Sequence, residues 1–202
     1  GSSAFYGCEK LSSEVFSSLP SNLKTIGSYA FNGCNVASGD IIIPEGVETI
    51  GSYAFKDCFN VTNIVVSSTV TNIGSYAFQN CRGLKELVVP DNVLHIDYGA
   101  FNGCDGLERL TIPFVGKRRS NNSSEALFGY MFGYVSSPGS RRVEQRYGSS
   151  SSSYDYCYIP TNLTEVVVTD ESRLSYGAFY GCVDLERVTL NEGVTDVGER
   201  AF

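Results

Sequence analysis

The sequence predicts a right-handed solenoid of stacked coils of about 23 residues, with a parallel β-sheet on one face. Short strands, turns and 3-10 segments are expected on the other face. Two observations lead to this prediction. One nine-residue motif recurs along most of the chain, and a short strand pattern lies between successive copies of it.

The recurring motif is an aliphatic residue, three variable residues, Ala-Phe, two more variable residues and Cys. Its period is 23 residues where the copies are most regular, as between Ala54, Ala77 and Ala100. A fixed spacing of this length is the signature of stacked coils. The Ala-Phe pairs lie at positions 4–5, 30–31, 54–55, 77–78, 100–101, 178–179 and 201–202.

The strand pattern is clearest at Leu84, Leu87 and Val89. Because side chains alternate along a strand, Leu87 and Val89 should face the core and Val88 the solvent. One coil could not fold alone, since about eight inward side chains at roughly 1.5–3 kcal/mol each do not offset about 35 kcal/mol of ordering entropy. Stacked coils would pair these strands about 4.8 Å apart in a parallel sheet.

The outward residues of these strands are the best candidates for binding a ligand. The first column is polar and varied, and the second is β-branched throughout. Exposed apolar residues in a row mark interfaces, although strand propensity and cross-strand packing would also explain the second column. The first column is Asp40, Asn63, Glu86, Arg109, Glu165 and Arg187, and the second is Ile42, Val65, Val88, Thr111, Val167 and Thr189.

Composition narrows the classes of function. A formal net charge of −7 argues against nucleic acid or an anionic membrane as the main partner. No apolar run reaches the roughly 18 residues that a membrane span needs. The chain opens at Gly1 without a signal peptide and stops inside a motif at Phe202. We therefore expect residues 1–202 to be one solenoid domain, cut from a longer protein.

The register fails between about Phe114 and Tyr158, a segment that we call the excursion. Ala100 and Ala178 are 78 residues apart, and only Ala126-Leu127 resembles a degenerate motif. The excursion has six basic and three acidic residues, a charge of +3 that leaves −10 for the rest. It is either an irregular coil with a flexible, serine-rich surface loop or a basic partner-contact site, since insertions on repeat arrays often lie on the binding face.

Chemistry at the cysteines or the single histidine is disfavoured. A column of thiols could suggest disulfides or a metal. However, each thiol follows a buried Ala-Phe pair, there is no Cys-x-x-Cys, and a buried free Cys behaves as a small apolar residue. His95 has no nucleophile placed beside it, and Cys157 lies outside the column and could be free. We predict no catalytic residue, metal site or cofactor. The column is Cys8, Cys34, Cys58, Cys81, Cys104 and Cys182.

Three tyrosines precede the Ala-Phe pair in consecutive coils, at Tyr29, Tyr53 and Tyr76. An aromatic strip can bind a sugar or a peptide. It can also pack between coils with its hydroxyl groups in water.

The pattern Leu-x-x-Leu-x-Val-Pro…Val-x-x-Ile-x-x-x-Ala-Phe-x-x-Cys resembles the BspA-type leucine-rich repeat, in five full and several partial copies. This resemblance implies a leucine-rich-repeat solenoid on the surface of a bacterium or parasitic protist, or secreted by it. It also implies adhesion to a protein or glycan ligand, including a host-derived one. We expect a non-enzymatic recognition module that contacts neither nucleic acid nor the membrane interior. The alternatives are a passive spacer and the accessory domain of an extracellular enzyme.

Overall fold

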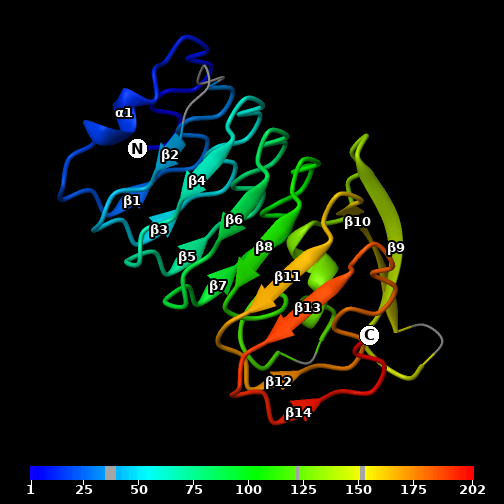
Figure 1. The fold of residues 1–202 in the computed structure, drawn as a ribbon. Helices are drawn as coiled ribbons and strands as arrows, with labels where there is room; N and C mark the ends of the chain where they lie inside the picture. The colour runs from blue at the N-terminus through cyan, green and yellow to red at the C-terminus, as the bar shows by residue number, and fades with distance from the viewer. Residues whose placement is uncertain (35–39, 122, 151–152) are drawn as a thin grey trace.

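Parallel strands lie side by side along one face of the molecule (Figure 1). The computed structural model describes residues 1–34, 40–121, 123–150 and 153–202. Its main sheet has six strands in the order β13-β11-β8-β6-β4-β2. The strands are β2 (Asp40–Ile42), β4 (Asn63–Val65), β6 (Glu86–Val88), β8 (Arg109–Ile112), β11 (Glu165–Val168) and β13 (Arg187–Leu190). The predicted parallel sheet and its coil period of about 23 residues are confirmed.

The opposite side of each coil is a two-residue strand followed by turns, as predicted. These strands pair in parallel in the orders β1-β3-β5-β7 and β12-β14. A four-residue helix, α1 (Glu14–Ser17), lies near the N-terminus. The short strands are β1 (Thr25–Ile26), β3 (Thr49–Ile50), β5 (Asn72–Ile73), β7 (His95–Ile96), β12 (Arg173–Leu174) and β14 (Asp196–Val197).

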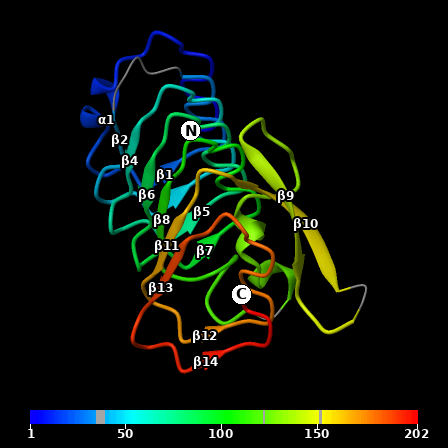
Figure 2. The ribbon, with the colours of Figure 1, turned by 45° about the vertical axis from the view of Figure 1, so that its right-hand side comes forward.

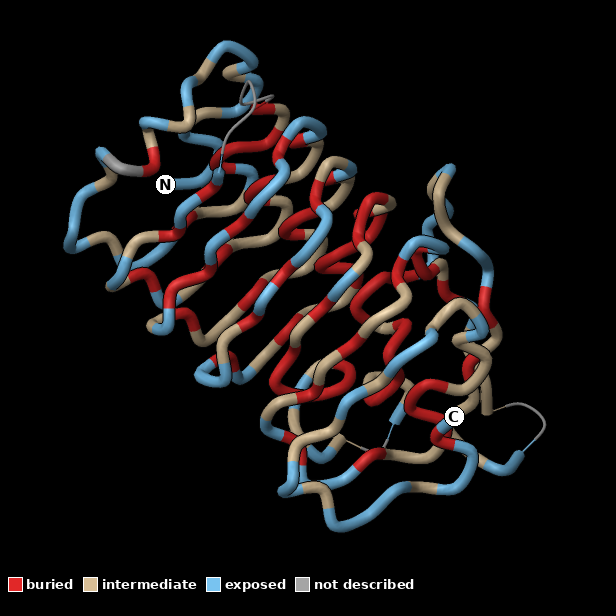
Figure 3. The backbone as a smooth tube through the Cα atoms, viewed as in Figure 1, coloured by how far each residue is buried: buried red, intermediate tan, exposed pale blue. Residues whose placement is uncertain are grey.

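The Ala-Phe pairs form the turn that stacks one coil on the next. The backbone N–H of Phe55 donates to the carbonyl of Ala77 at 2.8 Å, and that of Phe78 donates to Ala100 at 2.9 Å. The rings of Phe55 and Phe78 stack with their centroids 5.6 Å apart. This ladder closes the core along its length, and Figure 3 shows the strands of the main sheet alternating between buried and exposed residues.

The residue before each Ala has a left-handed backbone. Tyr29, Tyr53 and Tyr76 have φ values of 57°, 58° and 56°, and Gly99 has 65° at the same place. A residue with a Cβ atom adopts this conformation at a cost of roughly 1 kcal/mol. Stacking of the tyrosine rings of neighbouring coils helps to offset that cost.

The excursion contains two 3-10 helices and a β-hairpin. They are η1 (Ser124–Ala126), η2 (Phe128–Met131), β9 (Ser140–Arg146) and β10 (Tyr154–Pro160). Strands β9 and β10 pair antiparallel from Ser140↔Pro160 to Arg146↔Tyr154. The expectation of an irregular loop is therefore wrong for these strands, because Val143, Cys157 and Ile159 alternate inward and are buried. Ser151 and Ser152 of the serine run lie outside the described residues.

The main sheet passes the excursion without a break. Strand β8 pairs directly with β11 over four residue pairs. In the Ala-Phe ladder, by contrast, η2 adds one step, since Phe101 N–H donates to Met131 and Phe128 N–H donates to Ala178, each at 2.9 Å. The sequence suggested that Ala126-Leu127 forms the step of the ladder in this segment. The structure places that step at η2 instead. These two residues are buried but do not carry the ladder, because they precede the 3-10 turn that makes it.

Candidate functional site

The strand register aligns every candidate residue of the main sheet into the two predicted columns. Ile42 pairs with Val65, Val65 with Val88, and Val88 with Thr111. Beyond the excursion, Thr111 and Thr189 both pair with Val167. The six outward side chains of the second column therefore form one row across six strands.

The second column is most apolar and most exposed in its first half. Ile42 and Val65 are each 45% exposed and Val88 is 50% exposed. Thr189 is also exposed, whereas Thr111 and Val167 are half-buried. The contiguous aliphatic row is thus confined to β2, β4 and β6, where these side chains face solvent.

The first column neutralises much of its own charge. Arg109 Nη2 lies 2.9 Å from Glu86 Oε2, and Arg187 Nη1 lies 3.2 Å from Glu165 Oε1. Asp40 and Asn63 extend the column at its N-terminal end and are exposed. Exposed ion pairs of this kind add at most about 1 kcal/mol. They leave the aliphatic row bordered by a nearly neutral polar strip.

A shallow hollow of about 340 Å³ interrupts the sheet face between β4 and β6. Its lining includes the polar residues Asn63 and Glu86 and the apolar residues Val65, Val88 and Pro90. The hollow therefore lies at the most exposed part of the aliphatic row.

The seven cysteines are free thiols, and Cys157 is one of them. Four thiols of the column, those of Cys34, Cys58, Cys81 and Cys104, each donate to a Phe carbonyl of an earlier coil, as from Cys34 to Phe5 at 3.0 Å and from Cys104 to Phe78 at 3.2 Å. Burial raises the pKa of Cys104 to about 12. In the part of the chain that the structure describes, no three His, Cys, Asp or Glu side chains are grouped to hold a metal ion. The four column thiols that bond to Phe carbonyls are thus buried donors inside the core.

The tyrosine column is a stack whose rings cover one another. Tyr29 and Tyr53 stack with centroids 4.8 Å apart, and Tyr53 and Tyr76 with centroids 5.1 Å apart, both tilted by only 10°. Tyr98 continues the column edge-on to Tyr76. Because the facing sides of these rings are occupied, a sugar cannot stack between them, and packing between coils accounts for the spacing of the column.

His95 lies in β7 in register with Asn72 and is half-buried. Among the described residues, no cysteine thiol or serine hydroxyl forms a hydrogen bond with its imidazole. None of the described helices is long and apolar enough to cross a membrane.

The basic residues of the excursion mostly hold the fold together. Arg119 donates to the carbonyls of Asp91 and Val93 and to the Asp170 carboxylate, and so joins two coil corners. Four of the six basic side chains form ion pairs: Lys117 with Glu125, Arg119 with Asp170, Arg141 with Asp184 and Arg146 with Glu144. Because most of its basic side chains are paired, the excursion does not form a general basic patch on the surface.

Gln145, which sequence reasoning missed, fastens the hairpin to the coils. Its side chain is fully buried. Oε1 accepts from the backbone N–H of Gly129 at 2.6 Å, and Nε2 donates to the carbonyl of Tyr180 at 3.1 Å. The alternation of Arg142, Glu144 and Arg146 with Val143 and Gln145 was the available signal of a strand with one buried face.

Replacing Gln145 with Leu should destabilise the protein by about 2 kcal/mol, because the Gly129 N–H and the Tyr180 carbonyl lose their partner in a buried site. Urea unfolding followed by circular dichroism measures this. Glu144→Gln, on the outward side of the same strand, is the control and should cost under about 1 kcal/mol. Equal stability of Gln145→Leu and the wild type would contradict this role.

A family model described as a BspA type leucine rich repeat region, in six copies, matches residues 1–123 and 151–202. Among solved structures, a leucine-rich repeat protein from Bacteroides ovatus is similar over 100% of this chain and 60% of its own, with a TM-score of 0.51 and 22% identity. A leucine rich repeat protein from T. pallidum is similar over 87% of this chain and 67% of its own, with a TM-score of 0.50 and 20% identity. This chain thus spans less than two thirds of the first protein. Curated protein sequences give no match.

Proposed function

This chain belongs to the BspA-type leucine-rich-repeat family, and from that premise we propose that it recognises a protein ligand through its main sheet. Repeats of this family form interaction modules. The proposal includes a place on the cell surface or in the surrounding medium and no catalytic role. It also treats residues 1–202 as one solenoid domain, which the direct pairing of β8 with β11 supports.

The observation that carries the proposal is the exposed aliphatic row on β2, β4 and β6. Ile42, Val65 and Val88 present half of their surface to water although a Thr would satisfy the same strand position, as Thr111 does. Exposed apolar rows with a polar border are typical of interfaces. The hollow between β4 and β6 would receive a side chain of the ligand.

A protein suits this face better than a glycan. Sugar rings are usually held by the flat faces of aromatic side chains, and neither column of the sheet contains an aromatic residue. Aliphatic and β-branched side chains instead complement the apolar side chains of a protein.

The test is binding of the purified protein to immobilised extracellular-matrix proteins and to a glycan array. The double variant Val65→Glu, Val88→Glu should lose at least tenfold in affinity, because two charges would be buried on contact. Leu94→Glu is the matched control, since Leu94 is 52% exposed and lies outside the main sheet. It should bind within twofold of the wild type.

A second variant, Val65→Thr with Val88→Thr, covers the case in which the glutamates disturb folding. Thr already occupies this column at Thr111 and Thr189, so this variant should keep the fold and still weaken binding. Unchanged binding by every variant would exclude the main sheet as the contact surface. Binding to glycans alone would replace the protein ligand, and no binding at all would favour a spacer.

A further inference from the structure

The hairpin β9–β10 presents a second surface, which lies across the molecule from the main sheet in Figure 2. Its antiparallel register pairs Arg146 with Tyr154, Glu144 with Tyr156 and Arg142 with Tyr158. On the opposite face of the two strands, Val143, Gln145, Cys157 and Ile159 are buried. Two arginines, one glutamate and three tyrosines therefore share the outward face of the hairpin.

The side chains of this face are held in place by one another. The guanidinium carbon of Arg142 lies 3.8 Å from the centroid of the Tyr156 ring, and both side chains are exposed. The rings of Tyr154 and Tyr156 meet edge to face at 5.3 Å. Arg146 lies near Tyr154 and forms an ion pair with Glu144 at 2.6 Å. Little side-chain entropy would be lost when a partner binds there.

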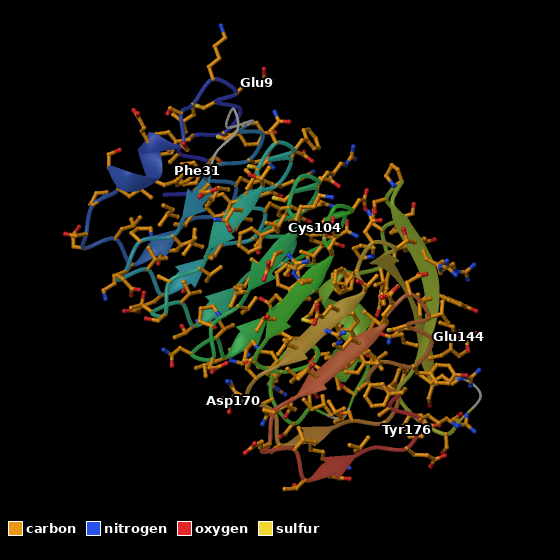
Figure 4. The ribbon with its side chains drawn as sticks, viewed as in Figure 1. Glu9, Phe31, Cys104, Glu144, Asp170 and Tyr176 are labelled. Carbon is orange, nitrogen blue, oxygen red and sulfur yellow. The ribbon has the colours of Figure 1, made fainter. Side chains whose placement is uncertain are left out.

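The hairpin itself is fixed in orientation. Gln145 joins it to Gly129 and Tyr180, and Arg141 lies 2.9 Å from Asp184 in the last coils. Figure 4 shows Glu144 on the hairpin, along the margin of the molecule. The hairpin is not part of the main sheet, which is continuous across the excursion because β8 pairs directly with β11. A rigid projection that the sheet does not require is well suited to hold a contact surface.

Charge selects the kind of partner. No carboxylate lies within ion-pair distance of Arg142 among the described residues, whereas the other guanidinium of this face, on Arg146, is neutralised by Glu144. The chain outside the excursion has a formal charge of −10, so it repels acidic molecules elsewhere. One available guanidinium suits one or two carboxylates. A polyanion such as nucleic acid would require many more cations.

We propose that the outward face of β9–β10 binds an acidic, extended segment of a partner protein. Arg142 pairs its planar fork of N–H donors with a carboxylate of that segment. Tyr154, Tyr156 and Tyr158 cover the apolar part of the segment, as tyrosine and arginine do at the centres of protein interfaces. This inference does not depend on the main sheet being a contact surface.

The test uses fluorescein-labelled ten-residue peptides that carry Asp or Glu beside an apolar residue, with matched peptides in which Asn and Gln replace the acids. Fluorescence anisotropy should detect binding of acidic peptides only. Arg142→Lys should weaken that binding at least tenfold, because lysine keeps the charge but loses the planar stack on Tyr156. Arg118→Ala, which removes an exposed charge of the excursion outside the hairpin, should change it less than twofold.

Three results would overturn the proposal. The first is that the acidic and amide peptides bind equally well, or that neither binds. The second is that Arg142→Lys and Arg118→Ala weaken binding of the acidic peptides to the same extent. The third is that a heparin oligosaccharide binds in preference to every peptide. The variant with Val65→Glu and Val88→Glu should bind the acidic peptides like the wild type. Failure of the main-sheet proposal and failure of this one are thereby distinguishable.

Discussion

Raising the pH from 9 towards 12 should unfold this protein cooperatively. Burial raises the pKa of Cys58, Cys104 and Cys157 from 9.0 to about 12, and raises that of Cys81 as well. In the unfolded chain these thiols ionise near pH 9. The folded state keeps their protons, so the stability that they confer is complete below pH 9 and is lost as pH rises towards 12.

The expected loss is large. Each thiol that ionises only in the unfolded chain lowers the free energy of unfolding by about 1.4 kcal/mol per pH unit. Four such thiols together give a slope of roughly 5 kcal/mol per pH unit, against a typical total stability of about 5–15 kcal/mol. One to three pH units above 9 would therefore suffice to unfold a protein of that stability.

Urea unfolding between pH 7.5 and pH 11, with a reductant present to prevent oxidation, measures the slope. Cys58→Ala with Cys104→Ala is the informative variant. It should be less stable than the wild type at pH 7.5. Above pH 9 its free energy of unfolding should fall less steeply, and the two slopes should differ by about 3 kcal/mol per pH unit. A slope that is the same in both proteins would show that other groups, such as the tyrosines, cause the alkaline unfolding.

Gly74→Ala should cost about 3 kcal/mol, although the φ of Gly74 lies outside the left-handed region. A Cβ atom on Gly74 would lie 2.7 Å from the backbone nitrogen of Ser52 and 2.9 Å from the carbonyl carbon of Gly51. These backbone atoms belong to the preceding coil, and the bond from Gly74 N–H to the Ile50 carbonyl holds the coils together at 2.8 Å. The clash can be relieved only by separating the coils.

Asp97→Ala is the matched control. Asp97 follows the aliphatic residue of its coil as Gly74 does, and its N–H donates to Ile73 at 2.8 Å in the same ladder. Its coil already accommodates a Cβ atom, so the change should alter stability by less than about 0.5 kcal/mol. Thermal unfolding followed by circular dichroism compares the two. Similar unfolding temperatures for the two variants would mean that the neighbouring coils can move apart enough to accommodate a Cβ atom at Gly74.

The regular coils could be predicted from the repeat in the sequence alone. A contact between coils joins residues one period apart, so the repeat that is visible in the sequence is also the map of the contacts. Leu87 and Val89 are buried and Val88 is exposed, as alternation requires. The same register aligned the outward columns correctly, from Ile42 at one end to Thr189 at the other.

The sequence did not reveal how closely the backbones of two coils approach. Gly74 could be assigned to a coil corner, but its lack of space depends on the distance to Ser52, which only the stacked coils define. The stacking of the tyrosine column likewise depends on the left-handed backbone at Tyr53 and Tyr76. The sequence therefore left packing and ligand binding as open alternatives for these rings.

The form of the excursion became known only from the folded chain. Gln145 bonds to Gly129 and Tyr180, which are 16 and 35 residues away, and neither interval is a multiple of the period. Pairing of β8 with β11 across the excursion is equally non-local. Where contacts repeat, one coil predicts the next. Where a contact is made once, by partners far apart in the chain, no pattern in the sequence marks it, and the folded chain alone brings the partners together.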